Sequence, residues 1–91
     1  MKNSRLIIAT AQFENRSGDK EYNLSVIASL SARAAEAGAD AIAFHECSIT
    51  GYTFAGKLSE SELLEIAEPI PDGPSVEGLA EIAGKNNIYV L

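Results

Sequence analysis

Three adjacent residues with reactive side chains follow an apolar run near the middle of the chain. They are His45, Glu46 and Cys47, and the apolar run before them covers residues 41–44. A carboxylate at the end of such a run, beside a packed sheet that excludes water, can serve as a general base. A solvated loop glutamate is the more frequent occupant of such a position, so two interpretations of Glu46 stand at this point.

Cys47 offers two further arrangements for a nucleophile. Adjacent side chains on an extended segment point to opposite faces, so Glu46 can activate the Cys47 thiol only where the chain bends. His45 and Cys47 would share a face, which permits a Cys–His dyad. A thiol beside a strand end is more often an inert apolar group, and these residues lack the spacing of a zinc site. We therefore predict no metal here.

The segment from Gly51 to Lys57 matches the first seven positions of a phosphate-binding P-loop. The eighth position is Leu58, where magnesium binding requires Ser or Thr. Tyr52 is bulky where backbone amides must wrap a phosphate, and the next helix signal comes only at Ser59. A surface loop with glycine hinges is the favoured interpretation, and a phosphate- or nucleotide-binding module is kept as an alternative.

Acidic residues dominate the second half of the chain, with no Lys or Arg between Leu58 and Gly84. The acidic side chains in this stretch are Glu60, Glu62, Glu65, Glu68, Asp72, Glu77 and Glu81. They alternate with apolar positions, a pattern typical of solvated helix faces rather than of a metal site.

Alternating strands and helices would position these side chains. Residues 5–12 and 41–44 form apolar runs typical of strands buried on both faces. Asp19 can cap a helix between them, and Gly38 can end it. This strand–helix–strand unit makes the two strands parallel. Ligands bind outside the carboxyl ends of parallel strands, which is where Glu46 falls.

Two more helices and a strand follow. The capping box from Ser59 to Glu62 predicts a short helix, and Pro74 fits the first position of another. Asn86 and Asn87 can end that helix, and residues 88–91 open a third strand. The order β-α-β-α-α-β gives an α/β fold. Because Leu91 lies inside an apolar strand, we expect the chain to be the N-terminal piece of a larger domain.

Composition excludes several classes of protein. The 91 residues are 46% hydrophobic and 22% charged, which is typical of a globular domain. The net charge of −6 argues against nucleic acid and anionic membranes as partners. No apolar run approaches the roughly 18 residues needed to span a bilayer. Cys47 is the only cysteine, so no internal disulfide forms, and we expect a cytoplasmic location.

A family resemblance rests on residues 38–46, Gly-Ala-Asp-Ala-Ile-Ala-Phe-His-Glu, followed by Thr50-Gly51-Tyr52. These residues resemble the glutamate-bearing motif of the nitrilase superfamily of carbon–nitrogen hydrolases. The end of the first strand at Gln12, Asn23 in the first helix, and residues 71–74 before the third helix also fit the family's layout. One departure is His45, because the family commonly has proline before the glutamate.

The resemblance implies an α-β-β-α sandwich with a Glu–Lys–Cys triad that cleaves small-molecule amides or nitriles. Glu46 is the only residue that maps onto the triad, as general base. The family's lysine and cysteine fall beyond Leu91, so Lys57, Lys85 and Cys47 are not assigned these roles. Residues 1–91 would then be the N-terminal part of a single hydrolase domain, inactive and poorly stable alone. No cofactor is implied, and the full-length protein is expected to form a homo-oligomer.

A third interpretation treats the chain as a non-catalytic α/β interaction domain. Substitution of Glu46 would then leave every activity of the protein intact.

Overall fold

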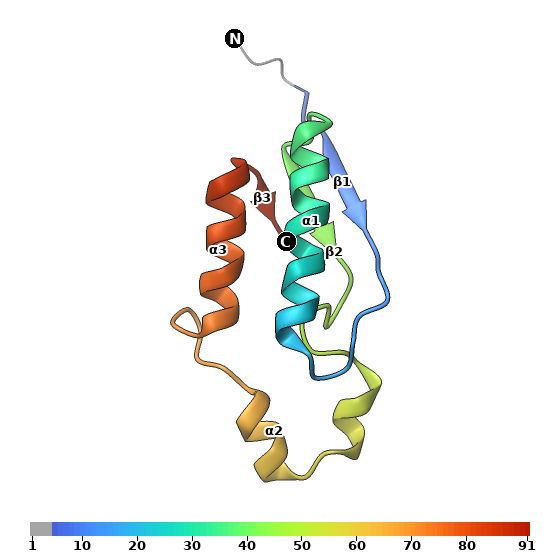
Figure 1. Cartoon of the computed structure of the whole chain (residues 1–91), viewed down its shortest axis with the longest axis vertical. Coiled ribbons are helices and arrows are strands. Elements are labelled where there is room, and N and C mark those ends of the chain that lie inside the picture. Colours follow the sequence, from blue (N-terminus) through green and yellow to red (C-terminus); the bar gives the residue numbers. More distant parts are fainter. Residues whose placement is uncertain (1–4) are drawn as a thin grey trace.

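The elements of the chain follow the predicted order, with one addition. The computed structural model describes residues 5–91; residues 1–4 of the proposed 1–91 unit lie outside the described residues. Within that range the elements are β1 (Ile8–Ala11), α1 (Lys20–Glu36), β2 (Ala41–Phe44), the 3-10 helix η1 (Thr53–Lys57), α2 (Glu60–Ile66), α3 (Pro74–Asn86) and β3 (Tyr89–Val90) (Figure 1). The predicted α/β order is confirmed, and η1 is the element that the sequence did not indicate.

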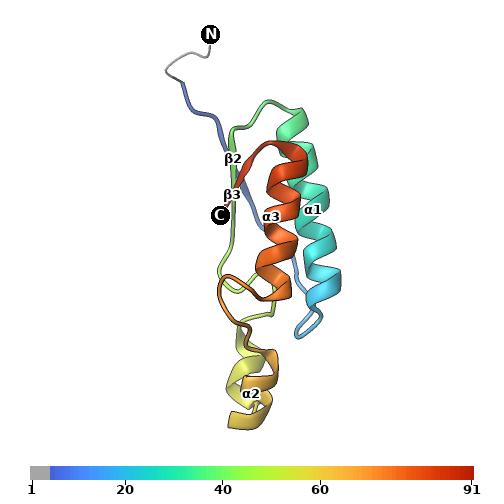
Figure 2. The ribbon, with the colours of Figure 1, turned by 90° about the vertical axis from the view of Figure 1, so that its left-hand side faces the viewer.

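The three strands form one parallel sheet in the order β1-β2-β3. Ile8 pairs with Ala41, and Ala41 pairs in turn with Tyr89. Helices α1 and α3 pack against each other, and Figure 2 shows both of them on the same side of the sheet. The core therefore lies between this helix pair and the central strand, where Ile27 and Ile42 are buried.

Local signals set the ends of α1 as predicted. The Asp19 side chain accepts a hydrogen bond from the backbone N–H of Tyr22 at 3.0 Å and so caps the first turn. At the other end, Gly38 has a φ of 95°, a left-handed conformation that favours glycine. The apolar stripe of this helix faces the sheet, where Ile27 is fully buried.

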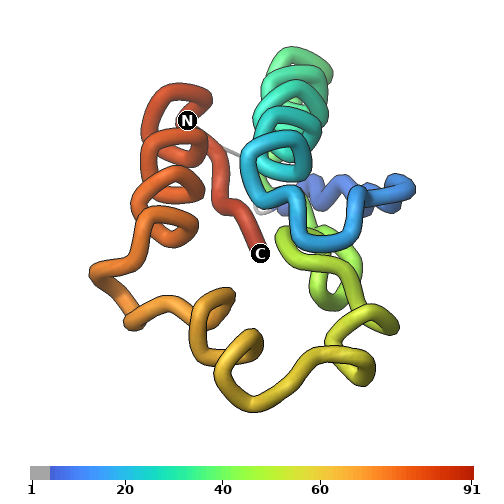
Figure 3. The backbone as a smooth tube through the Cα atoms, turned by 60° about the horizontal axis from the view of Figure 1, so that its bottom comes forward, coloured from blue at the N-terminus to red at the C-terminus, as the bar shows by residue number. Residues whose placement is uncertain are grey.

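The signals for α2 and α3 are also confirmed. Ser59 and Glu62 form both bonds of a capping box, and Pro74 stands at the start of α3. Asn87 ends α3 in the left-handed conformation, with a φ of 50°. Figures 1 and 3 show that η1 and α2 form an excursion that leaves the body after β2 and returns at the start of α3. None of the helices in residues 5–91 is long and apolar enough to cross a membrane.

One face of the sheet carries no helix in the described part of the chain. Ile8, Ala41 and Tyr89 are in register and share this face, and the exposed fractions of Ile8 and Tyr89 are 56% and 75%. Leu91, two positions beyond Tyr89, is 73% exposed. The prediction that the first and third strands are buried on both faces is therefore wrong for these residues, because a single helix layer covers only one face.

Candidate active site

Glu46 lies where a catalytic carboxylate is expected in a parallel sheet. Strand β2 ends at Phe44, and Glu46 is the first residue of a tight turn over residues 46–50, called the Glu46 turn below. Its side chain is exposed, outside the carboxyl end of the central strand. This is the edge of an α/β sheet at which ligands bind. The position predicted from the sequence is confirmed, although burial of the side chain is not observed.

The chain bends sharply immediately after Glu46. Cys47 has a φ of 56°, a left-handed conformation that is costly for a residue with a side chain. The backbone N–H of Gly51 donates to the Cys47 carbonyl at 2.8 Å and closes the turn. The shared face of His45 and Cys47 required an extended backbone, so that basis for a Cys–His dyad is wrong. Cys47 itself is exposed.

Asn15, in the loop between β1 and α1, holds the first part of the Glu46 turn. Its Nδ2 donates to the carbonyl of Cys47 at 2.9 Å and to that of Ser48 at 3.2 Å. In the same loop, the backbone N–H of Gly18 donates to the Thr50 carbonyl at 2.7 Å. The β1–α1 loop and the Glu46 turn are thus joined along their length, although they are about thirty residues apart in sequence.

Asn23, on α1, holds the later part of the Glu46 turn. Its Nδ2 donates to the Ile49 carbonyl at 2.7 Å and to the Arg16 carbonyl at 2.8 Å, and its Oδ1 accepts from the Arg16 N–H at 2.8 Å. The residue is 0% exposed. A fully buried amide is stable only with its polar atoms bonded, and here every hydrogen of the amide nitrogen has an acceptor.

His45 lies between the strand and Glu46 and packs against an aromatic neighbour. The centroid of its ring is 5.1 Å from that of Phe13. The Phe13 ring also packs edge-on against Phe44, with 6.3 Å between the two centroids. The Nδ1 atom of His45 is 3.2 Å from the Glu46 carbonyl oxygen, and its Nε2 is buried without a hydrogen-bond partner. A proline side chain has no polar atom, so it could not make the contact of Nδ1 with the Glu46 carbonyl.

Gly51 closes the turn in a conformation that requires glycine. Its φ is 94°, and a Cβ atom built on it would lie 3.1 Å from the Cα of Ser17. The close approach of the two loops therefore depends on the missing side chain.

The segment from Gly51 to Lys57 does not have the geometry of a phosphate-binding loop. Residues Thr53–Lys57 form η1, and Lys57 lies in its last turn rather than at the start of a following helix. Helix α2 begins only at Glu60, after the Ser59 cap. A P-loop needs an open run of backbone amides that leads directly into a helix, so this arrangement argues against the nucleotide-binding alternative. The expected surface loop is a short 3-10 helix instead.

Glu68 departs from the solvated faces predicted for the acidic residues. Its Oε2 is 2.6 Å from Lys20 Nζ and accepts from the Ser75 hydroxyl at 2.6 Å, while its Oε1 accepts from the Ser75 N–H at 2.7 Å. The hydrogen bond from Lys20 and those from Ser75 lower the pKa of Glu68 to about 2. Lys20 Nζ also donates to the Ile66 carbonyl.

No group of acidic, cysteine or histidine side chains in residues 5–91 could hold a metal ion.

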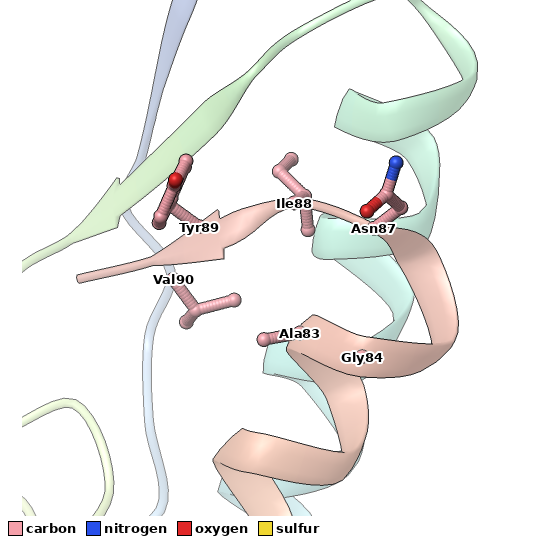
Figure 4. A pocket seen from close by; sticks show the side chains of 6 residues that line it. All are labelled: Ala83, Gly84, Asn87, Ile88, Tyr89 and Val90. Atoms are coloured by element: carbon pink, nitrogen blue, oxygen red, sulfur yellow. The ribbon is translucent and has the colours of Figure 1, made fainter.

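A cavity of about 500 Å³ lies between the end of α3 and β3 (Figure 4). The residues that line it are Ala83, Gly84, Asn87, Ile88, Tyr89 and Val90. Figure 4 shows the Val90 side chain pointing toward Ala83 and the Tyr89 side chain pointing to the opposite side of the strand. The lining carries no carboxylate or basic group, and the cavity lies where β3 begins, whereas Glu46 follows the end of β2. It is therefore not part of the Glu46 site.

Comparison with known families agrees with this geometry. The chain matches the family model described as carbon–nitrogen hydrolase over residues 7–91, nearly its whole length. None of the curated proteins compared with the chain matches it. The parallel sheet with two helices on one face fits part of the nitrilase fold. On this match, the chain belongs to the carbon–nitrogen hydrolase family of the nitrilase superfamily.

Proposed function

We propose that these residues form the N-terminal part of a hydrolase that cleaves small-molecule amides or nitriles, with Glu46 as its general base. The observation that carries the proposal is the place of Glu46. In a chain of this family, it stands at the carboxyl end of the central parallel strand, exposed and on a turn held by neighbouring segments. A carboxylate fixed at that edge can reach a ligand and take a proton from it.

In the proposed reaction, Glu46 removes the proton of a cysteine thiol that lies outside these 91 residues. The thiolate attacks the carbon of an amide, and a lysine stabilises the negative charge of the tetrahedral intermediate. The C–N bond breaks, ammonia or an amine leaves with a proton, and a thioester remains. Water, activated by the same carboxylate, then cleaves the thioester to release the acid and the thiol. Nothing in this sequence of steps requires a metal or a cofactor.

The proposal also includes the setting of the enzyme. We place it in the cytoplasm, as a homo-oligomer of the full-length polypeptide, with a small molecule rather than a nucleic acid or membrane as its partner.

Ammonia release from a panel of small amides and nitriles tests the role of Glu46. The assay uses the complete hydrolase polypeptide that contains these residues, with Glu46→Gln compared against the parent. Because a general base typically contributes 10²–10⁴-fold, we expect kcat to fall by at least about 100-fold. Glu60→Gln is the matched control, since Glu60 is an exposed carboxylate on α2 and its substitution should leave kcat unchanged.

The 91-residue chain is a second control in the same assay. It should release no ammonia above the level of its Glu46→Gln variant, because it supplies one of the three proposed triad groups. An unchanged kcat in Glu46→Gln of the complete polypeptide would refute the assignment of the base and favour the non-catalytic interaction domain. Activity of the 91 residues alone would refute the three-group mechanism.

A further inference from the structure

We infer that Asn15 and Asn23 are positioning residues, which aim the Glu46 carboxylate by binding the main chain of its turn. The inference rests on the proposed role of Glu46 as general base. Neither asparagine is placed to act on a substrate itself, because the amide hydrogens of both point at carbonyl oxygens of this chain. Their effect on the reaction would pass through the backbone that carries Glu46.

Three successive carbonyl groups of the turn are bound by these two side chains. Asn15 donates hydrogen bonds to the carbonyls of Cys47 and Ser48, and Asn23 donates one to the carbonyl of Ile49. The first bound carbonyl belongs to the residue directly after Glu46. Only the φ and ψ angles of Cys47 separate this carbonyl from the planar peptide unit that contains the Cα of Glu46. Bonds to the carbonyl therefore restrain these two angles and, through them, the direction in which the chain leaves Glu46.

The conformation of the turn explains why it needs such support. Cys47 has a positive φ, which is unfavourable for a residue with a side chain. Such a conformation persists only where surrounding contacts overdetermine it. The two asparagines come from different segments, the β1–α1 loop and α1, so they restrain the turn from two sides.

Asparagine is the residue type that these bonds require. Asn23 uses its Nδ2 for two carbonyls and its Oδ1 for the Arg16 N–H, all within a fully buried space. In Asn23→Asp, a carboxylate oxygen would face two carbonyl oxygens in place of the amide hydrogens. Asn15 makes its bonds from a half-buried loop position, so its removal disturbs the packing of the body much less.

Asn86 provides a matched control within the chain. Its Nδ2 donates to the Ile82 carbonyl at 2.9 Å, a bond of the same chemistry near the end of α3. That end of the helix leads into the start of β3, whereas the Glu46 turn follows the end of β2. Asn86→Ala therefore removes an asparagine–carbonyl bond without touching the turn.

The experiment combines kinetics with amide hydrogen exchange on the complete hydrolase. For Asn15→Ala and Asn23→Asp, we expect kcat to fall by about tenfold or more, since small misplacements of a reacting group are costly. KM should change by less than about threefold, because substrate contacts are kept. Exchange in a peptide covering residues 46–53 should accelerate, since the Gly51 amide donates to the Cys47 carbonyl. Asn86→Ala should alter neither quantity.

Two results would overturn the inference. One is a kcat of Asn15→Ala equal to the parent value, which would show that order in the turn does not serve the reaction. The other is an equal loss of kcat in Asn86→Ala, which would reveal a general effect of lost stability. Asn15→Ala decides the matter if Asn23→Asp does not fold. Failure of the proposed function is a separate result, an active Glu46→Gln enzyme, and the exchange data then still report whether the asparagines hold the turn.

Discussion

Glu68 shows how one side chain can join three segments that are distant in sequence. It follows α2, pairs with Lys20 at the start of α1, and accepts two hydrogen bonds from Ser75 in the first turn of α3. A carboxylate at a helix N-terminus accepts hydrogen bonds from N–H groups that otherwise lack partners. Its negative charge also interacts favourably with the positive end of the helix dipole. Because the side chain is only 13% exposed, solvent screens these interactions weakly.

The first prediction concerns the acid sensitivity that Glu68 confers. Its folded pKa of about 2 lies below the ordinary glutamate pKa of 4.5, so the stabilisation is present above pH 4.5 and is lost as the pH falls toward 2. At pH 7, Glu68→Gln should lower the free energy of unfolding by roughly 1.5–3 kcal/mol, the scale of hydrogen bonds to charged groups. Urea titrations of both proteins between pH 2 and 7 measure this difference, which should shrink on acidification.

Glu65→Gln serves as the control for that series, because Glu65 is an exposed carboxylate of the same acidic stretch. A pH-independent difference between Glu68→Gln and the parent would contradict the ionic origin of the effect.

The sequence could indicate Glu46, and Asn23 through the family's layout, but not the other residues that link distant segments of the chain. Glu46 was found because it follows an apolar strand and lies within a family motif, and the structure places it at the expected edge of the sheet. Asn15 and Glu68 were missed as structural residues. Their partners are backbone carbonyls, a lysine and a helix start that folding brings near, and such pairings leave no periodic pattern in the chain.

At the scale of elements, predictions based on neighbouring residues were confirmed. Asp19 begins α1, Ser59 begins α2 through its capping box, and Pro74 begins α3. Each signal acts within three or four residues, so it can be recognised without knowledge of the tertiary fold. The 3-10 helix η1 was missed, since Gly51 before it and Gly56 within it resemble the glycines of an open loop.

The second prediction is that the cap of α1 contributes measurably to stability. Asp19→Ala removes the acceptor for the Tyr22 N–H, and such losses typically cost about 1 kcal/mol. Chemical unfolding followed by far-ultraviolet circular dichroism measures the change. Glu14→Ala, in the preceding loop, is the control and should cost less than about 0.5 kcal/mol. Equal losses in the two variants would argue that charge, rather than capping, is responsible.

At the scale of the whole molecule, layering decides which apolar residues are buried. Strand sequences alone suggested burial on both faces, yet α1 and α3 occupy the same side of the sheet (Figure 2). A period-two pattern reports which residues share a face, but the presence of a second covering layer depends on contacts beyond the strand. For this reason Ile8, Tyr89 and Leu91 are exposed although their sequence context is that of a core.

The last prediction follows from that uncovered face. An apolar sheet surface with two unpaired strand edges in the described residues favours association, because burial of apolar area is worth roughly 25 cal/mol per Å². We expect the purified 91-residue chain to sediment as concentration-dependent oligomers, and Ile8→Lys or Tyr89→Lys to shift it toward the monomer. Leu64→Lys is the control, since Leu64 is 69% exposed but lies on α2, away from the sheet. If the unsubstituted 91-residue chain were monomeric and melted in one sharp cooperative transition, the expectation would be contradicted. The chain would then fold stably with this apolar face exposed to water.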